Sequence, residues 1–148
     1  MSDDMLARIA AAVERGRSGE RVAARAALEE LWEEIGDDAF HRCVLAHFLA
    51  DLQDDDHAEL HWDELALEAA AAVTGDASSQ VRGFLPSLYA SVADDHRRLG
   101  EAALAREFLD RARSAADVLG DDPYGMVVKG AMEKIAAALD EGSTERLS

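Results

Sequence analysis

Apolar residues recur along the chain at spacings of three and four, which is the pattern of helices that bury one face. Seven such stretches follow one another, separated by glycine, proline and acidic residues that are typical of helix ends. The sequence therefore predicts an all-α protein with about seven helices. They are expected at Asp4–Arg15, at Glu20–Ile35, from a cap at Asp37 or Asp38 through Leu49, from the run Asp54–Asp56 to Gly75, at Ser79–Leu99, at Glu101–Leu119, and from Asp122 to Gly142.

The connections between these stretches are short, so successive helices should lie antiparallel as helical hairpins. Pro86 stands inside the fifth stretch and should kink the helix or begin a new one, because proline cannot donate the helical hydrogen bond. We expect a single domain over residues 1–142. The segment 143–148, which follows the last stretch, is expected to be frayed.

Composition and charge narrow the picture further. Thirty of the 148 residues are alanine, whereas three are isoleucine and two are threonine, which favours helix and excludes an all-β fold. The formal net charge of −16 should repel nucleic acid. The N-terminal sequence has acids where a leader needs bases, and no apolar run is long enough to span a membrane. We therefore expect a soluble, cytoplasmic protein with neither nucleic-acid nor membrane partners.

The negative charge is concentrated in the middle of the chain. Residues 37–80 contain eleven acids and one base, whereas the segments on either side each have a net charge of −3. The plain interpretation is a solvated face that keeps the protein soluble. The alternative is a field that attracts a basic segment of a protein partner.

His57 and His61 are the candidates for a metal site. They are four residues apart on one predicted helix, a spacing at which two imidazoles can bind one ion. Glu59 stands one position too late to be the general base of a zinc-protease motif. Two histidines at a solvated helix start are the simpler interpretation, so we expect no metal, and a small metal-binding helical protein is kept as an alternative.

The chain lacks the sequence motifs of common catalytic sites. It has no glycine-rich phosphate loop after a strand and no Gly-X-Ser-X-Gly elbow, and Cys43 has no neighbouring motif that would activate its thiol. Adjacent acids such as Asp94 and Asp95 point about 100° apart on a helix and cannot share a proton. We expect a protein that is not an enzyme and needs no cofactor.

Two segments of the chain are similar to each other. Aligning residues 17–32 with residues 98–113 gives six identities, which are Arg17 with Arg98, Gly19 with Gly100, Glu20 with Glu101, Ala24 with Ala105, Arg25 with Arg106, and Leu28 with Leu109. A shift of 34 residues gives a second match, of residue character only. Such self-similarity is the signature of a repeat architecture.

The period of 34 residues and the spacing of small and large apolar residues resemble the tetratricopeptide repeat (TPR). Segment 99–112 carries the resemblance best, with Gly100, Ala105, Leu109 and Ala112 at the pattern's loop-glycine, small, large and small positions. The amino-acid sequence of this region is also similar to that of uncharacterised tetratricopeptide proteins of actinobacteria. Two features depart from the family pattern. The first-helix positions at which the family has Trp, Gly and Tyr hold other residues in this chain, and the proline that the family has at the end of the second helix is absent. The resemblance implies a TPR-like α-solenoid of three antiparallel helical hairpins and a C-terminal capping helix.

The resemblance also implies a function and a site. Repeats of this kind bind protein or peptide segments with a few side chains of an inner groove. Carried over to this chain, the groove positions are Ile9, Val13, Phe40, Cys43, His47, Ser87, Ala90, Asp94 and Arg97. We therefore expect a non-enzymatic interaction module for a protein or peptide. The alternatives are a self-associating helical scaffold, for which a homodimer is possible, and a metal-binding protein that uses His57 and His61.

Overall fold

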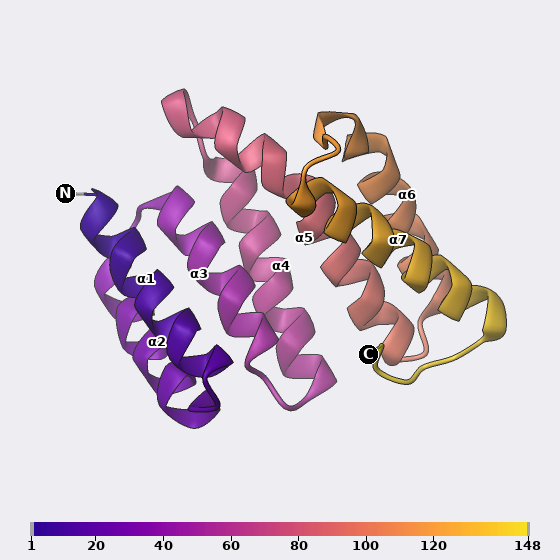
Figure 1. The fold of residues 1–148 in the computed structure, drawn as a ribbon, viewed down its shortest axis with the longest axis horizontal. Coiled ribbons are helices and arrows are strands. Elements are labelled where there is room, and N and C mark those ends of the chain that lie inside the picture. The colour runs from indigo at the N-terminus through magenta and orange to yellow at the C-terminus, as the bar shows by residue number, and fades with distance from the viewer. Residues whose placement is uncertain (1, 148) are drawn as a thin grey trace. The chain divides into compact units, whose positions relative to one another are not determined.

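The computed structural model describes residues 2–147, with side chains from residue 4 onward, and within that range it contains helices and no strand (Figure 1). The all-α prediction is confirmed. The chain divides into two compact units, Met1–Val73 and Thr74–Ser148, and each is described by itself. The single domain over residues 1–142 stays a prediction, and Met1 and Ser148 lie outside the described residues.

The first unit contains two helical hairpins. Its helices are α1 (Ser2–Arg17), α2 (Arg21–Ile35), α3 (Ala39–Asp51) and α4 (Asp56–Ala72). Helix α1 packs against α2 and α3 packs against α4, while α3 also contacts both α1 and α2. The core of the unit is made of Ile9, Ala12, Leu28, Leu31, Leu45 and Leu49. The spacing of apolar residues predicts Ala24, Leu28 and Leu31 as the inner face of α2, and all three are buried. The same spacing places Ala10 on the inner face of α1, which is wrong, since Ala10 is exposed and Ala12 is buried.

The second unit contains a third hairpin and one further helix. Its helices are α5 (Ser78–Arg98), α6 (Ala102–Ala115) and α7 (Pro123–Glu141), with short 3-10 turns at Gly75–Ala77 and Ala116–Val118. Helix α5 packs against α6, and α7 packs against both. The core of this unit is made of Ala90, Ala93, Ala105, Leu109, Ala112, Val128, Met132, Ile135 and Leu139.

Aspartates begin three of the helices. The side chains of Asp38, Asp55 and Asp122 each accept a hydrogen bond from the backbone N–H three residues further on, at 3.0, 2.9 and 2.9 Å. These caps satisfy N–H groups that have no partner inside the helix. At the start of α7 the capping loop folds back tightly, because a Cβ on Gly125 would lie 2.1 Å from the carbonyl oxygen of Gly120. Only glycine fits there.

The observed helix ends differ from the predicted ones in the second half of the chain. Helix α5 continues through Pro86, whose ring is buried, so a fresh helix start at this position is wrong. The sixth helix ends at Ala115 and not at Leu119, because a 3-10 turn follows it. Among the described residues, no helix has both the length and the apolar character that crossing a bilayer requires.

The turns of the α1–α2 and α5–α6 hairpins have the same geometry. Gly19 and Gly100, which the sequence alignment pairs, have φ angles of +102° and +80°, a conformation that favours glycine. The residue after each glycine donates its backbone N–H to the carbonyl five residues back, at 3.0 Å in the first hairpin and 2.8 Å in the second. The repeated sequence therefore corresponds to a repeated pattern of backbone hydrogen bonds.

The helix that follows each of these hairpins is attached in a similar way. Arg25 of α2 donates to the carbonyl oxygen of Leu52, at the end of α3, over 3.4 Å. Its aligned counterpart Arg106 of α6 donates to a carboxylate oxygen of Asp140, at the end of α7, also over 3.4 Å. In each unit, an arginine of the hairpin's second helix thus reaches the end of the helix that follows the hairpin.

An exposed ion pair joins α1 to α2 and makes the stability of the first unit depend on pH. The two terminal guanidinium nitrogens of Arg8, Nη1 and Nη2, donate to the carboxylate of Glu34, at 2.9 and 3.0 Å. These hydrogen bonds hold the pKa of Glu34 below its usual value. A carboxyl group whose pKa is lowered on folding stabilises the fold above its unfolded-state pKa and loses that contribution as the pH falls.

We therefore expect Glu34→Gln to lower the free energy of unfolding at pH 7, and we expect this difference from the parent to shrink as the pH falls below the usual glutamate pKa. Urea unfolding followed by circular dichroism at several pH values measures the difference. Glu33→Gln, on the same exposed turn, is the control. Equal effects of the two substitutions at pH 7 would contradict the assignment.

Candidate functional site

A furrow lies between α1 and α3 in the first unit. It consists of two hollows, of about 230 and about 200 Å3, which share Val13, Arg17 and Phe48 as lining residues. We call it the α1–α3 furrow. Its other lining residues are Leu6, Ile9, Ala10, Glu14, Gly16, Arg21, Val44, Asp51 and Leu52.

Helical spacing explains the lining. Positions 6, 9, 13 and 17 form one stripe of α1, and Val44 and Phe48 stand one turn apart on α3, so the two stripes face the same furrow. Gly16 marks a close approach, because a Cβ on it would lie 3.3 Å from the Cβ of Ala24 on α2 and 3.4 Å from a methyl group of Leu52. The missing side chain allows α1 and α2 to pack closely beside the larger hollow.

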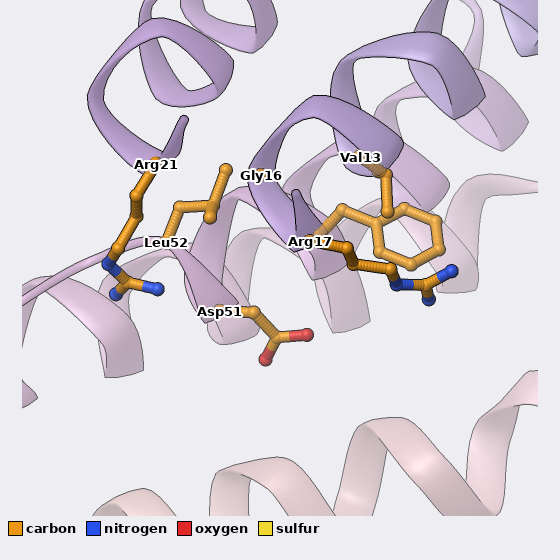
Figure 2. Close-up of a pocket in the computed structure, with 7 residues that line it drawn as sticks. Val13, Gly16, Arg17, Arg21, Asp51 and Leu52 are labelled. Carbon is orange, nitrogen blue, oxygen red and sulfur yellow. The ribbon is translucent and has the colours of Figure 1, made fainter. Parts of the chain in front are cut away.

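One end of the furrow is charged. Figure 2 shows the side chain of Asp51, from α3, projecting between those of Arg17, at the end of α1, and Arg21, at the start of α2. Burial raises the pKa of Asp51 above its usual value, and the attraction of His47, Arg21 and Arg17 for the carboxylate opposes this shift. The Arg21 guanidinium also donates to the carbonyl oxygen of Gln53 over 3.1 Å. The furrow thus offers an apolar floor beside groups that can bind a carbonyl, a carboxylate or a cation.

Five of the residues predicted for the groove lie in the first unit. Ile9 and Val13 line the furrow, whereas Phe40, Cys43 and His47 lie outside its lining. Cys43 is 1% exposed, and burial raises the pKa of its thiol to about 11, so the side chain is closed to a ligand and stays protonated at neutral pH. Burial also lowers the pKa of His47, which keeps that imidazole neutral.

The other four predicted residues lie on α5 in the second unit. Ala90 belongs to the core of that unit, so its side chain faces packed neighbours and is closed to a ligand. Ser87 and Asp94 are partly buried. The Nε of Arg97 donates to Asp94 over 2.8 Å, and this buried arginine also binds the segment that follows α7.

Several furrow residues were not among the predicted site residues. The spacing of apolar residues predicts Phe48 on the buried face of its helix, yet it is only partly buried and lines both hollows. Arg17 lies beyond the predicted end of the first helix, and the observed helix extends two residues further, to include it. The only signal in the sequence was the four-residue spacing that places Val44 and Phe48 on one face.

A further hollow of about 370 Å3 lies beside Trp32, where α2, α3 and α4 meet. The rings of Trp32 and Trp62 make an edge-to-face contact with centroids 5.0 Å apart, and both rings pack against the core of the first unit. The guanidinium carbon of Arg42 lies 4.0 Å from the centroid of the Trp32 ring. The chain's own cation therefore already covers the face on which a cationic ligand would stack.

His57 and His61 are both exposed on the first turns of α4. The ring of His61 makes an edge contact with that of Trp62, at 5.7 Å between centroids. Among the described residues, neither histidine belongs to a group of three side chains that could bind a metal ion together.

We expect zinc to bind these histidines loosely, because two imidazoles without a further ligand make an incomplete site. Removing metal should leave the helical circular dichroism and the thermal midpoint unchanged. Spectra with and without a chelator, together with equilibrium dialysis against zinc, measure this. Loss of helix on chelation would instead make the metal-binding alternative the better one.

Comparison of the chain with models of protein families, with curated proteins and with solved structures finds no match. The geometry of the residues therefore carries the functional argument.

Proposed function

We propose that the chain is a non-enzymatic module that binds a protein or peptide segment in the α1–α3 furrow. The observation that supports this most directly is the combination of apolar lining residues with the charged end formed by Arg17, Arg21 and Asp51. An apolar side chain of the bound segment would fill one hollow. A polar group of the same segment would meet the charged end, as in other sites that combine an apolar pocket with a few polar anchors.

The repeat character of the fold supports the same proposal. The paired glycine turns and the similar attachment of α3 and α7 are what a stack of related hairpins requires. We therefore propose that the chain is a TPR-like α-solenoid of three hairpins in which α7 is the capping helix. In such a stack the first helices of successive hairpins present the binding face, and α1 and α3 are the first helices of the first two hairpins.

The charge of the chain indicates what the segment should carry. Residues 37–80, which include α3 and α4, have ten more acids than bases. This field favours a partner segment that combines an apolar anchor with lysine or arginine.

Selection of peptides from a random display library against the full chain tests the proposal. We expect the selected peptides to share an apolar anchor flanked by basic residues. Ala10→Trp should weaken their binding at least about tenfold, because Ala10 is exposed on the wall of the smaller hollow and a tryptophan there would fill it. Ala11→Trp is the matched control, since Ala11 is the exposed neighbour on the same helix and does not line the furrow.

Selection of no peptide would count against the α1–α3 furrow as a binding site. So would unchanged binding of the selected peptides by Ala10→Trp, or equal weakening of their binding by Ala11→Trp. Circular dichroism of both variants shows whether the helices are retained.

We expect the association rate of a selected basic peptide to fall as salt concentration rises, whereas the dissociation rate should change less. The reason is that exposed charges steer the encounter, and the Debye length is about 8 Å at physiological salt. Replacing Asp54, Asp55 and Asp56 together by asparagine should slow association in the same way. Surface plasmon resonance measures both rates. Association that is equally fast at low and high salt would leave the acidic segment with a solubility role only.

Self-association is the second candidate function. Met126 and Val127, in the first turns of α7, are 64% and 70% exposed, and such a pair of apolar side chains favours contact with another surface. Light scattering measures the molar mass of the chain in solution. A dimer that Val127→Glu converts to a monomer would support the scaffold interpretation, and a monomeric parent would count against it.

A further inference from the structure

Arg97, near the end of α5, is a buried arginine whose side chain is held in one orientation. The side chain is 1% exposed, and its Nε donates to Oδ1 of Asp94, one turn earlier on the same helix, over 2.8 Å. The other carboxylate oxygen of Asp94 accepts from Nε of Arg98 over 3.1 Å. This arrangement fixes the plane of the Arg97 guanidinium and directs its two terminal nitrogens away from α5.

The two terminal nitrogens bind main-chain carbonyls of the segment that follows α7. Nη1 donates to the carbonyl oxygen of Ser143 and Nη2 to that of Glu145, each over 2.7 Å. In Figure 1 this segment runs from the end of α7 back to the end of α5. The segment that the sequence predicts to be frayed is therefore held by two short charge-assisted hydrogen bonds.

The two hydrogen bonds to Arg97 are made by main-chain carbonyls of the segment, and within the segment the Ser143 hydroxyl accepts from the backbone N–H of Glu145 over 3.3 Å. Thr144, Glu145, Arg146 and Leu147 are all exposed. Hydrogen bonds to carbonyl groups do not depend on the side chains that flank them, since every residue has a carbonyl. A different polypeptide with two carbonyls at the same spacing could therefore make both bonds to Arg97.

We propose that the end of α5 is a binding site for the main chain of a non-helical peptide segment, and that residues 143–147 occupy it as an internal ligand. Arg97 is the residue that binds, and Asp94 is the residue that positions it. A partner segment has to displace the chain's own tail. Because the tail is tethered next to the site, it competes at an effective concentration in the millimolar range.

This site is distinct from the α1–α3 furrow, since its residues belong to the second unit, and it does not depend on the proposed furrow function. Ala10→Trp should leave the binding of a tail peptide unchanged. The two proposals can therefore fail separately.

The test uses a fluorescent synthetic peptide with the sequence of residues 142–148, blocked at both ends so that no terminal charge takes part. We expect a chain that ends at Gly142 to bind it saturably in fluorescence anisotropy. The full chain should bind it at least about tenfold more weakly, because its own tail occupies the site.

Two variants of the shortened chain locate the binding. Arg97→Gln should lose it, and this variant keeps a cation beside Asp94, since Arg98 also binds that carboxylate. Arg106→Gln, an exposed arginine of α6 in the same unit, is the matched control and should bind like the shortened parent. In the shortened chain without a substitution, the Nε–H nuclear magnetic resonance signal of Arg97 should shift as peptide is added.

The proposal is overturned if the shortened, helical chain does not bind the peptide, if the full chain binds it equally well, or if Arg97→Gln has no effect. Should the shortened chain fail to fold, a chain with about twenty Gly and Ser residues inserted after Gly142 takes its place. This insertion keeps every contact and lowers the effective concentration of the tail, so the peptide should bind more tightly than to the native chain. Equal binding to both would overturn the proposal as well.

Discussion

Leu109→Ala lowers the free energy of unfolding by about 2–5 kcal/mol, the range expected when a buried leucine is cut back and the surrounding core cannot fill the space. Leu109 is 2% exposed and packs in the core of the second unit between α5, α6 and α7. The other core residues of α6 are the alanines Ala105 and Ala112, which are too small to close the cavity. Urea unfolding followed by circular dichroism measures the loss.

Leu104→Ala is the matched control for this prediction. Leu104 is on the same helix and is 41% exposed, so removing its side chain leaves no enclosed cavity. Its effect should stay within about 0.5 kcal/mol. Equal losses for Leu104→Ala and Leu109→Ala would contradict the assigned inner face of α6.

Ala24→Leu and Ala105→Leu each lower the free energy of unfolding by about 1–3 kcal/mol, because added methyl groups overpack a closely packed site. Both alanines are 0% exposed, and the sequence alignment pairs them. In the first hairpin the available space is small, since α1 presents Gly16 opposite Ala24. Thermal unfolding of each variant should show a lower midpoint than the parent.

Ala26→Leu and Ala103→Leu make the same substitution at exposed positions of the same two helices. They should leave the midpoint nearly unchanged, because leucine and alanine have similar helix propensity and nothing is displaced. If the buried and the exposed substitutions behave alike, the pairing of the two alanines as close-contact positions is wrong.

The helices and their buried faces could be predicted from the sequence because these features depend on residues close together in the chain. The spacing of Leu28 and Leu31 identifies the inner face of α2, and an aspartate before an apolar run caps its own helix, as Asp38 and Asp55 do. The glycine turns belong to the same class, since φ is a property of a single residue. The repeat alignment added the equivalence of Gly19 and Gly100.

The continuation of α5 through Pro86 could not be predicted in this way. The local cost of a proline inside a helix, about 3 kcal/mol or more, argues for an interruption. The buried ring of Pro86 and the packing of α5 against α6 and α7 offset that cost, and a local pattern contains no measure of them. Tertiary packing decides this position.

The lining of the α1–α3 furrow and the contacts of Arg97 could be predicted from the sequence only in part. The family resemblance places Ile9 and Val13 in the groove. Whether the side chain of Phe48 lines a hollow depends on how closely α1 approaches α3. The binding of the tail depends on one side chain 46 residues from the nearer of its two carbonyls. The contact is made by main-chain carbonyls, which every residue has, so the sequence of the tail does not reveal it.

The two hairpin turns share a backbone geometry but differ in what their side chains do. Segments 15–24 and 96–105 have the same length, a glycine at the same place and the same order of backbone hydrogen bonds. One aligned position nevertheless holds Gly16 in the first hairpin, where α1 lies close to α2, and Arg97 in the second, where the side chain binds the segment after α7. The same backbone turn therefore serves close helix packing in one hairpin and attachment of a distant segment in the other.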